Sequence, residues 1–559
     1  MKKCGLLFLI IAVCFAYLSP IAVERDGESE NKIPLLLSGR GVLIAQMGDI
    51  RGIMGSAGKN ITVCQHGDNI AVIYGAASAN PGNPMEIKIA YSVDSGATWA
   101  TYGPFSGELR RTYPAVDGSP NFCTNPGELY FVWQESQLGY YTGDLKVMIE
   151  EGTPSASSPS VPISLPNANE LYPWLPSIAV NPDDPYNVIV IAWSYLNGGN
   201  SMIYAWITND GAYTWIGPIP ICQISVQGGT GHVRWGTNNY IFFTFQDTFS
   251  IGGTQVVYPY YTESTDGGYT WSTPLPLPVP YVTATAQFWW TEFDCEVVNN
   301  EPWAVYTDLD SDSMWLFHGI GNPGNWTWEV FNARQIGAES LWVGDTLYYC
   351  YPSQYPNVSY EPVSNTILTS YKAHYLKVCA NDTIYDGAHI GGIYSTDNGV
   401  TWTITAPLSD PNTGQIDWFD WSATEVAHRL VNINGDVYSY GIWVNGTDLN
   451  LYFERGMIKP FYATGIEENS NGLASIHFQI SPSITTDICY ALFAMSSPGT
   501  VNLKLFDATG RLVEEVYDGH LEKGNQKLSI NTSKLANGIY FVSLETKVGT
   551  QTAKFIIAR

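Results

Sequence analysis

Arginine, aromatic and carboxylate side chains gather at five places along this chain, each at or just before a short apolar run. The segments read ELRRTYP, LYPWLP, GHVRWG, AQFWWTEFD and DWFDWSATEVAHR. Aromatic rings stack on the C–H faces of a sugar ring, and neighbouring polar groups hydrogen-bond its hydroxyls. The segments therefore predict a surface that binds a glycan or a protein. Its candidate residues are Arg111, Tyr113, Trp174, Arg234, Trp235, Trp289, Trp290, Glu292, Asp294, Trp418, Asp420, Glu425 and Arg429.

The same segments contain carboxylates that could act as a catalytic pair. Glycoside hydrolysis uses two carboxyl groups, and their separation decides the stereochemical course. Glu292 and Glu425 could form such a pair, but spacing along the sequence does not give their distance in space. Glycoside hydrolysis is therefore an alternative to binding alone, and the catalytic residues stay unassigned.

The acidic run DLDSDS contains Asp308, Asp310 and Asp312. Alternating aspartates can wrap Ca²⁺, but the glycine and the distal glutamate of an EF-hand loop are missing here. The run favours a solvated acidic loop. We predict no metal site and no cofactor, with calcium as the alternative.

Alternating apolar runs would position all these segments. Seven units each pair one inner run with a following run, from NIAVIYG with MEIKIAYS to DVYSYGIWV with LNLYFERG. A further short run, such as TYPAVDG or DCEVVNN, precedes most units as an innermost strand. About four short strands in roughly sixty residues is the spacing of a β-propeller blade. We expect residues 33–46 to supply the last strand of the seventh unit and close the ring.

Four copies of a turn pattern, S-x-D-x-G-x-T-W, follow such runs. They are SVDSGATW, TNDGAYTW, STDGGYTW and STDNGVTW, of which the second has alanine in place of glycine. The aspartate can accept backbone N–H groups within a hairpin turn, and the tryptophan can bury its ring between sheets. We predict a structural role for Asp94, Trp99, Asp210, Trp215, Asp266, Trp271, Asp397 and Trp402.

With these turns the chain resembles the Asp-box (BNR) repeat proteins of the sialidase-like β-propellers. The resemblance implies an all-β fold, and seven units imply seven blades. Six blades, the number in the sialidase catalytic propeller, are the alternative. A sialidase would further require three arginines on one ligand carboxylate, for which Arg111, Arg234 and Arg429 are available. The arginine-isoleucine-proline signature near the start of sialidases is absent from this sequence.

Antiparallel strand order separates the turns from the candidate binding segments. The turns between third and fourth strands lie at one end of the blades. The chain enters each innermost strand at the opposite end, where ligand chemistry is therefore expected.

The net charge disfavours several kinds of partner, and the first residues indicate export. The net charge of -26 disfavours nucleic acid and anionic lipid. Residues 1–22 carry Lys2 and Lys3 before an apolar run and are typical of a secretory signal, and no later segment could span a membrane. Nine cysteines without C-x-x-C spacing indicate buried thiols with one or two disulfides.

The composition changes after residue 462, which ends the predicted propeller (23–462). A polar linker (463–472) leads to about seven short strands (473–559), a pattern typical of a small β-sandwich. The wording VNLKLFDATGRLVEEV, LANGIYFVSLE and KFIIAR resembles the type A C-terminal sorting domain of the type IX secretion system. That resemblance implies handling by the type IX machinery, and secretion or attachment at the outer-membrane surface of a Gram-negative bacterium.

Overall fold

The computed structural model describes 22 stretches of the chain: residues 41–46, 58–76, 86–103, 110–125, 128–136, 143–150, 161–195, 201–225, 231–251, 254–279, 293–308, 313–343, 346–379, 382–409, 424–444, 450–460, 478–481, 484–485, 488–495, 498–507, 511–547 and 549–557. The predicted signal (1–22) and linker (463–472) lie outside them, as do Asp310 and Asp312. The chain divides into two compact units, Met1–Gly465 and Ile466–Arg559.

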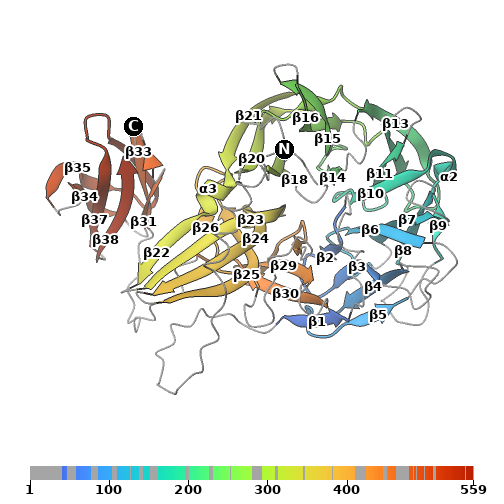
Figure 1. Cartoon of the computed structure of the whole chain (residues 1–559), viewed down its shortest axis with the longest axis horizontal. Coiled ribbons are helices and arrows are strands. Elements are labelled where there is room, and N and C mark those ends of the chain that lie inside the picture. Colours follow the sequence, from blue (N-terminus) through green and yellow to red (C-terminus); the bar gives the residue numbers. More distant parts are fainter. Residues whose placement is uncertain are drawn as a thin grey trace, which may run out of the picture. The chain divides into compact units, whose positions relative to one another are not determined.

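The first unit is built almost entirely of strands, as Figure 1 shows. Its described helices are α2 (Ala168–Leu171) and α3 (Ala333–Gly337). Its described strands form seven sheets in which neighbouring strands run antiparallel. Each of the first five sheets adds its four strands in chain order, so that each strand pairs with its neighbour in sequence. This order allows a short hairpin at every step.

The strands of these five sheets have the following bounds. The first sheet has β2 (Ile61–Val63), β3 (Ile70–Ala76), β4 (Glu86–Ser92) and β5 (Ala100–Tyr102). The second has β6 (Arg110–Gly118), β7 (Leu129–Ser136), β8 (Gly143–Ile149) and β9 (Ile163–Ser164). The third has β10 (Pro173–Val180), β11 (Val188–Tyr195), β12 (Ser201–Thr208) and β13 (Ile216–Ile224). The fourth has β14 (His232–Trp235), β15 (Ile241–Ile251), β16 (Thr254–Ser264) and β17 (Leu275–Pro276). The fifth has β18 (Phe293–Val298), β19 (Glu301–Asp308), β20 (Ser313–Asn322) and β21 (Asn325–Asn332).

The last two sheets depart from this simple order. The sixth has β22 (Glu339–Val343), β23 (Thr346–Glu361), β24 (Thr366–Cys379), β25 (Asp382–Ser395) and β26 (Thr403–Ile404). The seventh has β27 (Thr424–Val426) and β28 (Val431–Ile433), both on β29 (Asp436–Val444), then β30 (Leu451–Met457) and β1 (Val42–Ala45). Strand β1 pairs with β30, Val42 opposite Phe453, so residues 42–45 supply the outermost strand as expected.

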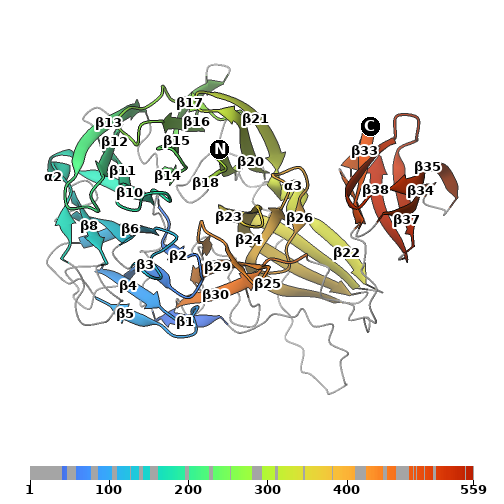
Figure 2. The ribbon, with the colours of Figure 1, turned by 180° about the vertical axis from the view of Figure 1, so that it is seen from behind.

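The sheets follow one another around a common centre (Figures 1 and 2). The innermost strands contact each other in the order β2, β6, β10, β14, β18, β23, β27, and β29 of the seventh sheet returns to β2. Apolar clusters fill the space between neighbouring sheets. One of them packs Val72 of the first sheet with Tyr440 and Phe453 of the seventh. Each such large side chain contributes about 1.5–3 kcal/mol by leaving water.

Three innermost strands, β6, β10 and β23, share a local irregularity. In each, a residue with positive φ precedes a proline, and the register with the next strand shifts at that point. Proline has no N–H to donate, so it is tolerated in a bulge where the described residues pair no strand on the axial side, and in β23 this stretch lies beyond residues 346–350, which pair with β22. The three pairs are Tyr113-Pro114 (φ 54°), Leu175-Pro176 (φ 52°) and Tyr355-Pro356 (φ 56°).

The second unit contains two sheets. One has β31 (Phe478–Ser481), β33 (Ile488–Met495) and β36 (Gly524–Asn531). The other has β32 (Ile484–Thr485), β38 (Gly549–Ile557), β37 (Gly538–Thr546), β34 (Gly499–Asp507) and β35 (Leu512–Leu521). Buried residues of both sheets form one apolar core, with Ala491 and Phe493 from the first and Leu503 and Val542 from the second.

Candidate functional site

The four turn boxes make one repeated set of hydrogen bonds. Asp94 accepts from the Thr98 N–H (2.8 Å) and the Thr98 hydroxyl (2.6 Å), and the Ser92 hydroxyl also donates to it (2.8 Å). The hydrogen bond from the Thr98 side chain lowers the pKa of Asp94. Asp210, Asp266 and Asp397 accept the same three bonds at 2.6–2.9 Å. These aspartates hold their own turns closed.

The tryptophan of each box packs on the preceding sheet. Trp99 lies edge-on to Phe453 with ring centroids 5.1 Å apart, and Trp402 lies 6.0 Å from Trp303. Trp215 and Trp271 join the apolar clusters that contain the second and third sheets. The indole ring of each tryptophan therefore links its box to the neighbouring sheet.

The boxes lie at the same end of the sheets as the turns between first and second strands. The Ser95 N–H donates to the Asp68 carbonyl (2.9 Å), and the Gly267 N–H donates to the Asn239 carbonyl (3.0 Å). We call this end of the first unit the Asp-box end. The opposite end, where the innermost strands begin, we call the upstream end.

An ion pair and an aromatic group lie at the upstream end. Arg111 Nη2 lies 2.6 Å from Glu135 Oε1, and both side chains are about nine-tenths buried. Tyr113 lies edge-on to Trp174 at 5.5 Å between ring centroids, and Trp174 tilts against Trp193 at 5.1 Å. Tyr113 and Trp174 keep part of their surface exposed, whereas Trp193 is fully buried. Here β6 and β10 present rings with charged groups beside them.

The other predicted binding residues divide into three groups. Trp235 is 7% exposed and belongs to the apolar cluster between the third and fourth sheets. Trp289, Trp290, Glu292, Trp418 and Asp420 lie outside the described residues. Arg234, Asp294, Glu425 and Arg429 belong to a polar cluster at the centre of the ring, which we call the axial cluster.

The axial cluster is built around residues 58–60, which cross the centre of the ring just before β2. A Cβ on Gly58 would lie 2.6 Å from the Ala115 Cβ, so only glycine fits against β6 there. The Asn60 side chain donates to the Ile73 carbonyl (3.1 Å) and the Pro114 carbonyl (2.9 Å). These three residues thereby join the first and second sheets at the axis.

Lys59 extends from this segment toward the fifth and sixth sheets. Its Nζ lies 2.5 Å from Asp294 Oδ2 and donates to Asn357 Oδ1 at 2.5 Å. His232 Nδ1 lies 3.1 Å from Asp294 Oδ1, and Arg234 lies 3.8 Å from the same oxygen. Burial opposes ionisation of Asp294, but Lys59, His232 and Arg234 outweigh it and hold its pKa well below the usual range.

A second layer of the cluster lies nearer the Asp-box end. His428 Nε2 lies 2.8 Å from Asp117 Oδ1, and His428 Nδ1 lies 3.4 Å from Glu296 Oε2. Arg234 Nε lies 3.6 Å from Glu296. Arg429 donates to the Val63 carbonyl (2.5 Å) and the Gly118 carbonyl (3.2 Å). Three cations, Lys59, Arg234 and Arg429, thus face three carboxylates, Asp117, Asp294 and Glu296, in a largely buried environment.

Glu425 differs from the other carboxylates of the cluster. It accepts the Asn60 backbone N–H at 2.5 Å. Burial raises its pKa to about 7, against the opposing attraction of Lys59. A carboxyl group with this pKa can carry a proton near neutral pH, which is the property of a general acid.

The three arginines of the sialidase resemblance have separate partners. Arg111 pairs with Glu135, Arg234 with Asp294 and Glu296, and Arg429 with main-chain carbonyls. Arg111 lies six residues before Asp117 on β6, which corresponds to roughly 20 Å along a strand. These contacts give no support for a three-arginine carboxylate clamp.

Lys59, Asp117, Glu296 and Asn357 were not predicted as site residues. Asp117 and Glu296 interrupt the apolar runs TYPAVDG and DCEVVNN, and a charge inside an innermost strand was the available signal. Lys59 has no such signal, because a lysine between glycine and asparagine is typical of an exposed turn.

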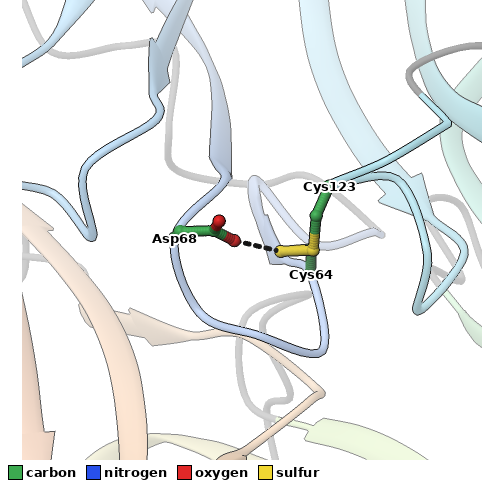
Figure 3. A group of neighbouring side chains, drawn as sticks. All are labelled: Cys64, Asp68 and Cys123. Carbon is green, nitrogen blue, oxygen red and sulfur yellow. Dashed lines mark hydrogen bonds between the residues drawn. A yellow bond between two sulfur atoms is a disulfide. The ribbon is translucent and has the colours of Figure 1, made fainter.

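Among the described side chains, one group has the composition of a metal site: Cys64, Asp68 and Cys123. Figure 3 shows the Asp68 carboxylate facing the Cys64 sulfur, 3.0 Å away. A disulfide joins the two cysteines, with Cα atoms 5.6 Å apart. Metal binding needs the thiolate, which a disulfide does not offer. The group instead links the β2–β3 turn to the β6–β7 turn, while Cys222, Cys295 and Cys489 are free thiols.

Comparison with known proteins gives a family match for the tail and only weak structural likenesses for the rest of the chain. No curated protein matches this chain. Among solved structures, the NanB sialidase from Streptococcus pneumoniae is 12% identical with a TM-score of 0.37, over 64% of this chain and 70% of that one. Trypanosoma rangeli sialidase is 11% identical with a TM-score of 0.36, over 92% and 86%. Penicillium chrysogenum α-L-arabinanase is 12% identical with a TM-score of 0.37, over 75% and 98%. We draw no functional conclusion from likenesses this weak.

No described helix has the length and apolarity that crossing a membrane requires.

The tail gives the firmer result. Residues 485–558 match the family described as secretion system C-terminal sorting domain. The second unit therefore carries the sorting signal that the sequence predicted, and the protein is one that is exported, to the cell surface or to the medium.

Proposed function

We propose that this protein is a seven-bladed β-propeller with a small β-sandwich tail, and that the upstream end of the propeller binds an extracellular glycan. Seven sheets in contact around one centre, with β1 completing the last, support the blade count. Two sheets over one core support the sandwich. In this proposal the Asp boxes brace the scaffold, and recognition takes place at the other end.

The aromatic pair Tyr113 and Trp174 carries the proposal. The two rings come from neighbouring innermost strands, keep part of their surface exposed, and have the Arg111–Glu135 ion pair close by on β6 and β7. A sugar needs such an arrangement, because its C–H face stacks on a ring while its hydroxyls need donors and acceptors. Stacking on an edge-to-face pair would also cost little entropy, since the rings are already held in place.

A glycan array with the purified protein tests the proposal. We expect binding to one class of oligosaccharide, and a loss of at least about tenfold in affinity for Trp174→Ala, equivalent to about 1.4 kcal/mol. Tyr213→Ala is the matched control, because Tyr213 is an aromatic residue of the second Asp box that is 82% exposed. Equal binding by Trp174→Ala and wild type, with both folded by circular dichroism, would contradict the assignment.

Glycoside hydrolysis is the second candidate, and the raised pKa of Glu425 favours it. A general acid must hold its proton at the working pH, and burial gives Glu425 that property. Turnover of aryl glycosides or sialosides by the wild type, and its loss in Glu425→Gln, would support this function. Wild-type protein that binds glycans but releases no aryl group would leave binding alone.

A further inference from the structure

One pair of side chains in the axial cluster, Lys59 and Asn357, holds an amine against a carboxamide at the distance of a short hydrogen bond. Lys59 Nζ lies 2.5 Å from the carboxamide oxygen of Asn357. The two residues are 298 positions apart in sequence, and they are 2% and 4% exposed. A primary amine and a carboxamide are the two groups from which an amide crosslink can form, with ammonia as the leaving group.

Contacts with neighbouring strands fix the main chain of the segment that carries Lys59. The Val116 N–H donates to the Lys59 carbonyl at 2.7 Å. On either side of it, Gly58 fits against Ala115 and Asn60 donates to Glu425. A side chain anchored in this way has few other positions open to it.

The asparagine is held equally firmly. Its Nδ2 donates to the Tyr355 carbonyl at 2.9 Å, across the bulge in β23. The Val426 N–H points at its Oδ1 from 3.4 Å. Holding two reacting groups together in a site without bulk water replaces a bimolecular step by an intramolecular one, and the effective concentration can reach about 10⁵ M or more.

We propose that Lys59 and Asn357 form an intramolecular amide bond in the folded protein. In this reaction Nζ attacks Cγ of Asn357, the Cγ–Nδ2 bond breaks, and the carboxamide nitrogen leaves. The lysine enters as an ammonium and the nitrogen of Asn357 departs as an ammonium, so that atoms and charge balance. No oxidant, reductant or cofactor takes part.

Neighbouring residues supply the proton transfers. Asp294 Oδ2, 2.5 Å from Nζ, takes each proton that the amine gives up and passes it to the departing carboxamide nitrogen, so that the carboxylate is ionised before and after the reaction. The Val426 N–H is placed to stabilise negative charge that develops on Oδ1 of Asn357 during the attack.

Asn357 is a better target for attack by the amine than Asp294, although one oxygen of each side chain lies 2.5 Å from Nζ. The Asp294 carboxylate stays ionised among three cationic or hydrogen-bonding partners, and it also accepts the Val358 N–H at 3.0 Å. An ionised carboxylate repels a nucleophile, whereas a neutral carboxamide with hydrogen bonds to its oxygen does not. We therefore assign the bond to Asn357.

Mass spectrometry of the reduced, purified protein tests the proposal. We expect the intact chain to be lighter by one ammonia molecule than its sequence requires. Trypsin cannot cleave after an acylated lysine, so residues 52–88 should stay in one piece and appear joined to residues 335–372. A wild-type chain of full mass, with cleavage after Lys59, would overturn the proposal.

Two further outcomes would also overturn it. Loss of ammonia without the joined peptide would indicate ring closure at an asparagine instead, and loss of water with a bond to Asp294 would mean the wrong acceptor. Lys59→Arg and Asn357→Ala should both restore the full mass expected of their sequences. Persistence of the deficit in Asn357→Ala would assign it elsewhere.

Discussion

Replacing Glu425 by glutamine should change how the stability of the first unit depends on pH. The folded-state pKa of Glu425 is raised from its ordinary 4.5 to about 7. Below pH 4.5 the group is protonated in both the folded and the unfolded chain. As the pH rises toward 7, the unfolded chain ionises while the folded chain does not, so the wild type loses stability across this interval.

The size of the effect follows from the difference in pKa. A rise in the pKa from 4.5 to about 7 is worth somewhat more than about 3 kcal/mol for a fully buried group, and solvent screening of the partly exposed Glu425 side chain lowers this to about 3 kcal/mol. Glutamine does not titrate, yet its carbonyl oxygen can still accept the Asn60 N–H. The free energy of unfolding of Glu425→Gln should therefore rise relative to wild type by up to this amount between pH 4.5 and 7, and stay level outside that interval.

Scanning calorimetry from pH 4 to 8 would measure this difference as a gap in unfolding temperature. For a unit of this size, about 3 kcal/mol corresponds to about 3 °C. Glu361→Gln is the matched control, because hydrogen bonds from Ser364 outweigh burial and lower the pKa of Glu361. The stability that Glu361 contributes is present above its ordinary pKa and lost in acid, so the deficit of Glu361→Gln should shrink as the pH falls. Parallel pH profiles for wild type and Glu425→Gln would refute the reasoning.

Four further outcomes are expected. Asp266→Ala removes three hydrogen bonds from one box and should lower the unfolding free energy by about 1–3 kcal/mol without changing glycan binding, whereas altered binding at full stability would give the box another role. Arg234→Leu leaves Asp294 and Glu296 without the cation that they share and should lower the unfolding free energy by about 3–5 kcal/mol, measured by thermal melting. A melting curve equal to that of the wild type would mean that Arg234 does not stabilise the cluster. Replacing Cys64 and Cys123 together by serine opens a bridge of 59 residues and should cost up to about 4 kcal/mol, and insensitivity of the wild type to reductant would contradict this. Deleting residues 466–559 should leave the chain in the periplasm on cell fractionation, and normal export of the truncated chain would show that the matched tail is dispensable.

Periodic features of the sequence predicted most of the fold. Strands such as β7 and β29 follow apolar runs bounded by turn residues, and their neighbours in sequence are their neighbours in the sheet, so local pattern was sufficient. The Asp-box geometry was equally local, since Asp94 and Thr98 are four residues apart.

The axial cluster could not be predicted in the same way. Lys59 meets Asn357 across 298 residues, and no periodicity records that the segment before β2 meets the middle of β23 at one axis. Trp235 illustrates a second limit of reading a site from sequence neighbours. Its neighbours His232 and Arg234 suggested a binding surface, but alternation along β14 places its ring in the apolar layer between sheets.

The pairing of β1 with β30 has a consequence for how this protein matures during export. Residues 42–45 precede every other described strand in the chain, yet their partner strand ends only at Met457. Until β30 has formed, β1 has no partner strand and the ring of sheets stays open. A prematurely terminated chain keeps these unpaired strand edges, which proteases and other chains can reach. Moving residues 42–45 to follow β30 in a circular permutant would let the last sheet assemble from one continuous stretch.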